Sequence, residues 1–97
     1  MSRDSPITLD TQVEILKAIA DPVRLDLLKR IAAVPEMACT DLVEQSHVAK
    51  STVSYHMKSL RIAGLIEVRK EGRNFHYTFR PDAMKHLMSV LGEIGPQ

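Results

Sequence analysis

The fold of this chain is decided by residues 49–64, which read Ala49-Lys50-Ser51-Thr52-Val53-Ser54-Tyr55-His56-Met57-Lys58-Ser59-Leu60-Arg61-Ile62-Ala63-Gly64. At a helical period, Val53, Met57 and Leu60 share one apolar face at positions i, i+4 and i+7. Gly64 suits the end of such a helix, because glycine adopts the left-handed conformation without a Cβ clash. The pattern therefore predicts a helix over residues 49–63.

The opposite face of this predicted helix is polar and basic. It contains no acid, and its residues are Lys50, Ser51, Ser54, Tyr55 and Lys58. Lysines attract phosphates as point charges, and hydroxyl groups donate to phosphates or contact base edges. These side chains are therefore candidates for contact with nucleic acid. The alternative is an ordinary amphipathic helix whose charged face meets only water.

Charge is unevenly distributed along the 97 residues. Residues 46–80 contain seven cations and two acids, a net charge of +5, while the remaining segments carry −4 and leave the chain at +1. A positive segment on an otherwise acidic body is typical of a protein that presents one face to a polyanion.

A helix is predicted before this stretch, from Pro22 to about Ala33. Asp21 is a good N-cap, and proline is tolerated at the first helical position. Pro35 ends the helix, because the residue before a proline is pushed out of the helical region.

A short third helix is predicted over residues 41–45, after a link at residues 36–39. Thr40 is its expected N-cap. Residues 46–48 then form the turn into the helix at residues 49–63. Two helices joined by about three residues, the second with a basic face, indicate a helix-turn-helix.

The hydrophobic period changes from 3.6 to 2 after Gly64. Apolar and polar residues alternate over residues 66–69 and 75–79, on either side of a glycine-containing turn. The alternation predicts a β-hairpin over residues 66–79, with Lys70 and Arg73 at its basic end. Next to a helix-turn-helix, this hairpin is interpreted as a DNA-binding wing. The alternative is a plain hairpin whose charged tip serves solubility.

Helices are also predicted near both ends of the chain, over residues 8–20, with Thr8 or Thr11 as N-cap, and over residues 81–94. Apolar terminal helices in so short a chain need a surface to pack against, so we predict that they form a homodimer interface. The alternative is that both helices close the monomer core. The predicted interface residues are Leu9, Val13, Leu16, Met84, Leu87, Met88 and Leu91.

Three stretches carry recognisable motifs, and they are Ala20-Asp21-Pro22-Val23-Arg24-Leu25, residues 51–60, and Arg61-Ile62-Ala63-Gly64-Leu65-Ile66, with Glu71-Gly72-Arg73 at the hairpin tip. In order and spacing they resemble the ArsR-type (arsenic-repressor) family of winged helix-turn-helix transcription regulators, over about residues 9–91. The resemblance implies a mainly α fold with a small β-hairpin, in the order four helices, two strands and a fifth helix. It also implies a homodimer that binds an inverted-repeat DNA operator, usually as a repressor that an effector releases.

Two positions depart from the family pattern. The helix-turn-helix turn often contains glycine where this chain has His47, and histidine tolerates a left-handed backbone better than β-branched residues do. The recognition helix often begins with a serine cap where this chain has Ala49, a poor N-cap. Ser46 or Ser51 is expected to compensate.

The sites at which many relatives bind thiophilic metals are incomplete here. The family's Cys-x-Cys-Asp-Leu stretch corresponds to residues 37–42, which retain only Cys39, and its last-helix site corresponds to Asp82 and His86 without a second histidine. We therefore expect no metal and no cofactor. Cys39 stays an effector candidate as a redox thiol, including through a Cys39–Cys39 bridge between subunits. The alternative is a small buried hydrophobe.

The other histidines are interpreted as structural or surface residues. His56 lies beside the apolar stripe of its helix and is expected to be half-buried, with its ring hydrogen-bonded. His47 and His76 are expected to be exposed, and His76 could touch phosphate.

The sequence indicates one regulatory domain over residues 1–97, with a flexible N-terminus at residues 1–7. Enzyme motifs, a signal peptide and a membrane-length apolar run are absent from it, so we expect no catalysis and a cytoplasmic, nucleoid-associated protein. Its expected function is sequence-specific binding of double-stranded DNA through the helix at 49–63 and the wing at 66–79. The predicted DNA-binding residues are Lys50, Ser51, Thr52, Ser54, Tyr55, Lys58, Lys70 and Arg73.

Two questions about partners stay open at this point. A small-molecule or redox effector is compatible with the sequence. The alternative to a DNA-binding regulator is a winged-helix module that binds another protein, and the local charge of +5 favours DNA.

Overall fold

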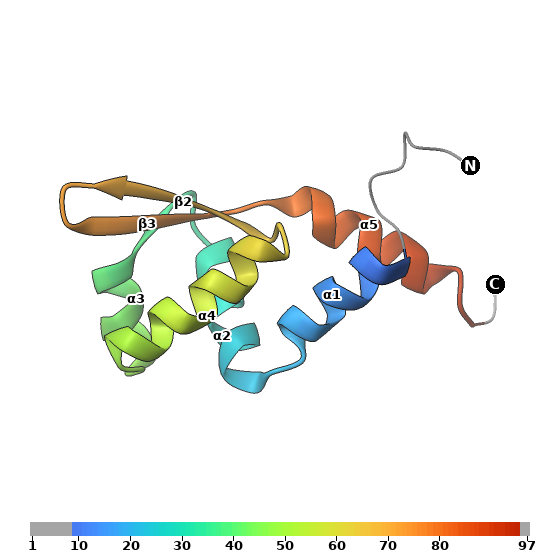
Figure 1. Ribbon diagram of the computed structural model, residues 1–97, viewed down its shortest axis with the longest axis horizontal. Helices are drawn as coiled ribbons and strands as arrows, with labels where there is room; N and C mark the ends of the chain where they lie inside the picture. Colours follow the sequence, from blue (N-terminus) through green and yellow to red (C-terminus); the bar gives the residue numbers. More distant parts are fainter. Residues whose placement is uncertain (1–8, 96–97) are drawn as a thin grey trace.

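The computed structural model describes residues 9–95, and within them it contains five helices and three strands (Figure 1). In chain order these are α1 (Leu9–Ile19), α2 (Pro22–Ala32), β1 (Met37–Ala38), α3 (Cys39–Ser46), α4 (Lys50–Ile62), β2 (Ile66–Glu71), β3 (Asn74–Phe79) and α5 (Pro81–Gly92). The predicted helices and hairpin are confirmed. The predicted flexible segment at residues 1–7, and Thr8 as an N-cap, lie outside the described residues.

The start of α2 is confirmed in detail. The Asp21 carboxylate accepts a hydrogen bond from the backbone N–H of Arg24 at 2.9 Å, and Pro22 occupies the first turn. This bond lowers the pKa of Asp21 below its ordinary value. Two other predicted caps are wrong. Thr11 and Thr40 both lie inside their helices, because α1 already includes Leu9 and α3 begins at Cys39.

The turn between α3 and α4 depends on a left-handed residue. His47 ends α3 with φ at 61°, and its N–H donates to the Val43 carbonyl at 3.0 Å. Ser46 Oγ donates to the Leu42 carbonyl at 2.7 Å and accepts from the Val48 N–H at 3.2 Å. Ser46 therefore stabilises the turn, while α4 itself starts after Ala49 without a side-chain cap.

The sheet contains one strand that was not predicted. β2 and β3 form the expected antiparallel hairpin, with Val68 opposite Tyr77 and Gly72 at φ 63° in its turn. β1 adds to the outer edge of β3, with Met37 opposite Tyr77, and gives the order β1-β3-β2. The predicted link at residues 36–39 is therefore partly a strand. With only two residues, β1 has no alternation that periodicity could detect.

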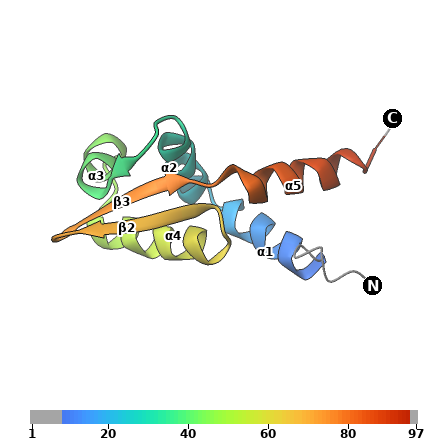
Figure 2. The same cartoon turned by 90° about the horizontal axis from the view of Figure 1, so that it is seen from above.

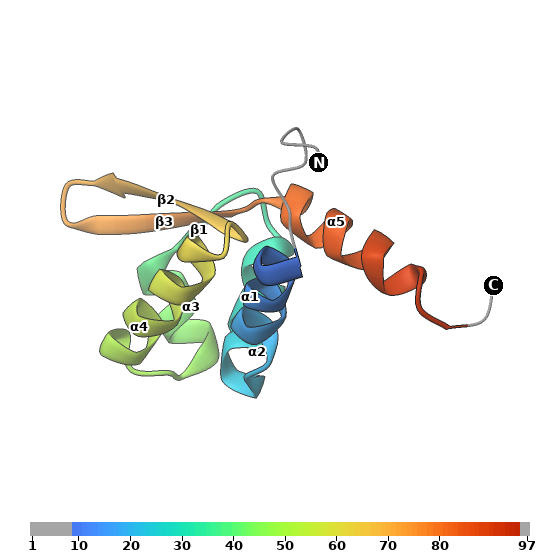
Figure 3. The same ribbon diagram turned by 45° about the vertical axis from the view of Figure 1, so that its right-hand side comes forward.

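The apolar face of α4 lies at the centre of the core. Val53 and Leu60 have no exposed surface, and Met57 is also buried. Leu65 at the end of the α4–β2 turn and Tyr77 of β3 pack in the same cluster. Figure 3 shows α3 and α4 beneath the hairpin, and buried residues of α1, α2 and α5 complete the core.

The wing, defined as residues 66–79, and α5 extend toward opposite ends of a molecule that measures 43 × 28 × 21 Å (Figure 2). On α1, the side chains facing the core are Ile15 and Ala18. On α5, Leu87 is 1% exposed and belongs to the core, so its assignment to a dimer interface is wrong. Helical periodicity placed Leu87 and Met88 on one apolar stripe, but packing buries only the first.

Ion pairs tie the wing to the segment before β1. Arg69 of β2 donates to both Glu36 carboxylate oxygens, at 3.1 and 2.9 Å, and to Glu71 at 2.8 Å. These hydrogen bonds lower the pKa of Glu36 and the pKa of Glu71 below the ordinary value of 4.5. All three side chains face solvent, so the pairs orient the wing rather than support the core.

The left-handed backbone at His47 generates a stability prediction. His47→Gly is expected to raise the free energy of unfolding by about 1 kcal/mol, because glycine has no Cβ to clash at positive φ. His47→Val is expected to lower it. Urea denaturation measures both. In the control Gln45→Gly, at an exposed helical position of α3, the free energy should fall by about 1 kcal/mol. A His47→Gly variant as weakened as the control would contradict the left-handed turn.

The Arg69 ion pairs generate a pH prediction. In Arg69→Met, the pKa of Glu36 and that of Glu71 should rise toward 4.5, because the hydrogen bonds that lower them are gone. A lowered folded-state pKa stabilises the fold above the unfolded-state pKa, and the gain disappears as pH falls through the folded value. The variant should therefore be less stable than the parent at neutral pH and equally stable in strong acid.

Carboxyl NMR titration and urea denaturation at both pH extremes measure these two effects. Arg61→Met is the matched control, since Arg61 is exposed and has no ion pair within residues 9–95. If the two carboxyl groups titrated alike in Arg69→Met and the parent, the ion pairs would not form in solution.

Candidate nucleic-acid interface

The eight predicted DNA-binding side chains are all exposed, and they lie on α4 and the wing. We call them the α4–wing surface, and they are Lys50, Ser51, Thr52, Ser54, Tyr55, Lys58, Lys70 and Arg73. Tyr55 is 63% exposed, a large fraction for an aromatic residue. The burial of the apolar face of α4 turns six of these side chains outward together.

The positive charge of this region is more localised than the sequence suggested. Of the seven cations in residues 46–80, Arg69 pairs with Glu36 and Glu71, and Arg80 pairs with Glu67. The other five of these seven cations form no ion pair with any residue in 9–95, and they are Lys50, Lys58, Arg61, Lys70 and Arg73. All five are exposed and come from α4 or the wing.

A shallow groove of about 220 Å³ lies between α4 and the wing. Its lining residues are Ser54, Met57, Lys58, Arg61, Val68, Phe75 and Tyr77. Lys70 lies over the Phe75 ring, 5.7 Å from its centroid. Arg61 was absent from the predicted site. The helical spacing of the sequence could have identified it, because Ser54, Lys58 and Arg61 repeat at i, i+4 and i+7 along one face.

His56 is confirmed as a structural histidine, although it is more buried than expected. It is 6% exposed, and its Nδ1 accepts a hydrogen bond from Arg24 Nε at 3.1 Å. The ring therefore faces the body of the protein, and the exposed Tyr55 beside it faces out.

The expectation for His76 is wrong. Its side chain is only 21% exposed and lies between two carboxylates, 4.0 Å from Glu36 and 3.9 Å from Glu71. A phosphate would meet two negative charges at this position, so His76 is poorly placed for a phosphate contact. His47 is exposed, as expected.

Cys39 is confirmed as a small buried hydrophobe. Its side chain is 3% exposed and packs in the core beside Tyr77. Burial, with a hydrogen bond to Cys39, raises the pKa of Tyr77. A Cys39–Cys39 bridge between subunits would require the core to open, so the structure contradicts that alternative.

The described residues do not form the metal site that the sequence comparison with the family had considered at the last helix. His86 Nε2 lies 3.4 Å from Gln12 Nε2, which joins α5 to α1. Within residues 9–95, no three His, Cys, Asp or Glu side chains are grouped so that they could hold a metal ion. Over the same residues, each helix is too short or too polar to span a bilayer.

Sequence comparison identifies relatives of known class. A family model described as a helix-turn-helix domain matches residues 19–69. An uncharacterized HTH-type transcriptional regulator from Methanocaldococcus jannaschii is 34% identical over 82 residues, which cover 84% of this chain and 91% of the relative. The arsenical resistance operon repressor of Staphylococcus aureus is 38% identical over 80 residues, which cover 82% and 76%.

Solved structures agree with this assignment. The homodimeric winged helix-turn-helix DNA-binding domain of a possible ArsR-family regulator from Mycobacterium bovis matches with a TM-score of 0.74 and 26% identity, over 94% of this chain and 84% of that one. The matched fold, the identity to an arsenical repressor and the cations gathered on α4 and the wing lead to one conclusion. The chain belongs to the ArsR family of winged helix-turn-helix transcriptional regulators.

Proposed function

We propose that this regulator acts as a homodimeric repressor that binds an inverted-repeat DNA operator through α4 and the wing. The observation that carries the proposal is the α4–wing surface with Arg61, where five exposed cations have no ion-pair partner within residues 9–95. Unpaired cations release counterions when they meet phosphates, and this release supplies much of the affinity for a duplex.

The side chains of the surface divide by chemistry. Lys50, Lys58, Lys70 and Arg73 are suited to phosphates, since they carry charge on long flexible stems. Ser51, Thr52, Ser54 and Tyr55 are suited to base edges in the major groove, because hydroxyl groups both donate and accept. Their order along α4 places the base-reading groups between the two lysines.

The wing presents its own phosphate contact. Arg73 follows Gly72 in the two-residue turn between β2 and β3, so its side chain leaves the tip of the hairpin. Arg69, opposite His76 in the half of the hairpin next to the turn, pairs with Glu36 before β1 and with Glu71 of its own strand. From this tip, Arg73 would contact the backbone next to the groove that α4 enters.

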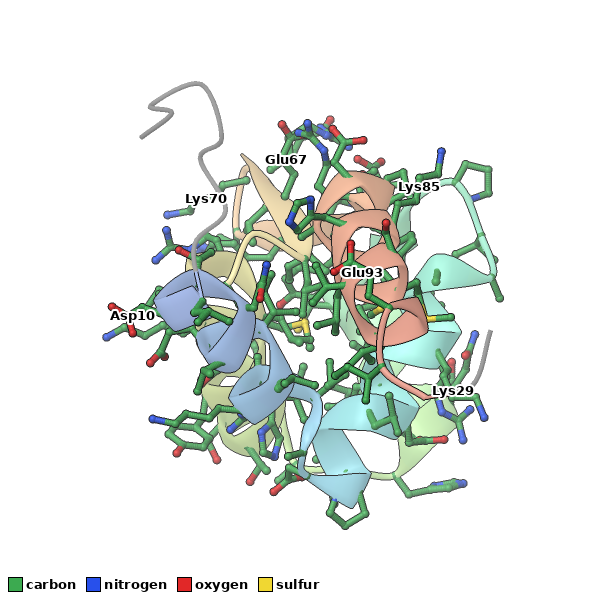
Figure 4. The ribbon with its side chains drawn as sticks, turned by 90° about the vertical axis from the view of Figure 1, so that its right-hand side faces the viewer. Asp10, Lys29, Glu67, Lys70, Lys85 and Glu93 are labelled. Carbon is green, nitrogen blue, oxygen red and sulfur yellow. The ribbon has the colours of Figure 1, made fainter. Side chains whose placement is uncertain are left out.

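The proposed dimer interface lies on α1 and α5. The predicted residues Leu9, Val13, Leu16, Met88 and Leu91 are exposed, and Met88 is 62% exposed. Figure 2 shows α1 and α5 at the end of the molecule away from the tip of the wing, and Figure 4 views them from that end. Apolar side chains gathered at one end favour burial against a second copy. The Mycobacterium bovis relative is homodimeric, and dyad-related α4 helices would read half-sites ~34 Å apart.

The repressor role is supported by the relatives. The Staphylococcus aureus protein is an arsenical resistance operon repressor, and a dimer that covers an operator excludes other proteins from it. Selection of bound duplexes from a random pool tests the proposal. Enrichment of an inverted repeat with half-sites one turn apart is the expected result. A pool without any enriched sequence would favour a protein-interaction module instead.

Tyr55→Ala and Arg73→Ala are expected to impair DNA binding in different ways. Tyr55→Ala should relax sequence preference, because a base contact is lost. Arg73→Ala should weaken binding to every duplex alike and reduce the slope of log K against log salt by about one unit, because a phosphate contact is lost. Fluorescence anisotropy at several salt concentrations measures both.

Lys29→Ala and Lys85→Ala are matched controls for Arg73→Ala. Figure 4 shows these two lysines on the side of the molecule away from Lys70. They should leave the salt slope unchanged. An Arg73→Ala variant that behaved like these controls would show that the wing does not contact DNA.

Met88→Glu is expected to separate the dimer. An unpaired charge at a buried interface costs about 3 kcal/mol, which corresponds to a ~100-fold rise in the dimer dissociation constant. Sedimentation equilibrium measures the change. Val34→Glu, at an exposed apolar position between α2 and β1, is the control and should remain dimeric. Equal dissociation constants for the two variants would contradict an interface on α1 and α5.

A further inference from the structure

Arg24 connects three helices through one side chain. Its backbone lies in the first turn of α2, where its N–H donates to Asp21 at 2.9 Å. Its Nη1 donates to the Ala18 carbonyl near the end of α1 at 3.3 Å, and its Nε donates to His56 Nδ1 of α4 at 3.1 Å. The central guanidinium carbon also lies 5.8 Å from the centroid of the Tyr55 ring.

Tyr55 is held on two sides by this arrangement. Its ring meets the ring of His56 edge to face, with centroids 5.2 Å apart and planes at 61°. The guanidinium of Arg24 covers the ring as a cation over an aromatic face. An exposed tyrosine without such contacts would populate several side-chain rotamers. Arg24 and His56 therefore restrict the direction in which the phenol leaves α4.

The contacts of Arg24 require the shape of arginine. A guanidinium is a planar fork with donors in fixed directions, and it stacks on rings. Lysine keeps the charge, but it has one donor group and no plane. His56 Nδ1 accepts the bond from Arg24, so the hydrogen of the neutral ring is assigned to Nε2. By accepting this bond, His56 orients the Arg24 guanidinium, which lies over the ring of Tyr55.

We propose that Arg24 is a positioning residue for base reading by Tyr55. It holds the phenol in the orientation that meets a base edge, and it ties this orientation to the end of α1. The inference rests on the proposed function, in which Tyr55 contacts a base. Arg24 is itself only partly exposed, and its backbone N–H, its Nε and its Nη1 each donate a hydrogen bond within the protein.

Positioning and direct phosphate contact have different signatures. A positioning residue changes the ratio of affinities for the operator and for single-substitution duplexes, but leaves the salt slope alone. A residue that contacts phosphate changes the salt slope by about one unit and leaves the ratio alone. Arg24→Lys conserves charge and removes the fork, so it tests the first possibility. Arg24→Gln removes the charge and tests the second.

The deciding experiment is a double-mutant cycle over the parent, Arg24→Lys, Tyr55→Ala and the double variant. Each protein is titrated with the selected operator and with every single-substitution duplex, at several salt concentrations. Arg24→Lys is expected to lower discrimination at one base pair by ~10-fold in the parent and to have no effect once Tyr55 is alanine. Arg30→Lys is the control, because Arg30 lies on the same helix and, among the described residues, its side chain pairs only with Asp26.

The outcomes separate the two proposals. If Tyr55→Ala discriminates between duplexes as well as the parent does, Tyr55 does not read a base, and both the base-reading role of Tyr55 and the positioning role of Arg24 are wrong. If Tyr55→Ala loses discrimination while Arg24→Lys keeps it, only the positioning role is overturned. A salt slope reduced by one unit in Arg24→Gln, in both Tyr55 backgrounds, would make Arg24 a phosphate contact and would also overturn it.

A measurement without DNA keeps the inference testable if a variant binds poorly. NMR of the Tyr55 ring in the free dimer should show one ordered orientation in the parent and rotamer averaging in Arg24→Lys. Thermal unfolding of both proteins checks that the variant is folded. An equally ordered ring in the two proteins would overturn the positioning role.

Discussion

The burial of one face of α4 is the constraint on which the rest of the structure depends. Val53 and Leu60 have no exposed surface, and Met57 between them is buried as well. Because side chains of a helix point in directions set by their spacing, these three residues also fix the outward direction of Lys50, Ser54 and Lys58. The core thus sets the rotation of the helix, and the rotation sets the polar surface. Any change in the packing of Val53 or Leu60 would rotate the candidate site as one body.

Electrostatics refine the surface that the core presents. The ion pairs of Arg69 and Arg80 neutralise two cations of the basic segment, and the Arg69–Glu36 pair joins the wing to the segment before β1. Within the basic segment at residues 46–80, the five cations that form no ion pair with a described residue lie on α4 or on the wing. The same network surrounds His76 with carboxylates and removes it from any phosphate contact. Charge counted along the sequence overstated the number of available cations, but it located their segment correctly.

Local signals were predictable, and long-range packing was not. The Asp21-Pro22 start of α2, the apolar stripe of α4 and the alternation of the hairpin all act between residues close in sequence, so each could be predicted. Strand β1 depends on pairing with β3, about forty residues away, and it is too short to show a period. The burial of Leu87 beside an exposed Met88 depends on where α1 lies. The contacts of Arg24 with α1 and α4 also depend on tertiary packing, so the sequence indicated Arg24 only as part of a family motif.

Arg24 joins the two surfaces on which the proposed function depends. On α1, Arg24 donates to the carbonyl of Ala18, whose side chain is buried. The exposed apolar side chains of the same helix, Val13 and Leu16, face away from the core. A partner subunit that shifts α1 would therefore move an acceptor of the guanidinium. The guanidinium is bonded to His56 and covers Tyr55, so the displacement would reach the exposed ring of α4 without any rearrangement of Val53 or Leu60. The hydrogen bonds of Arg24 would therefore transmit a displacement of α1 to α4 more directly than the apolar core would, since a closely packed core resists small displacements.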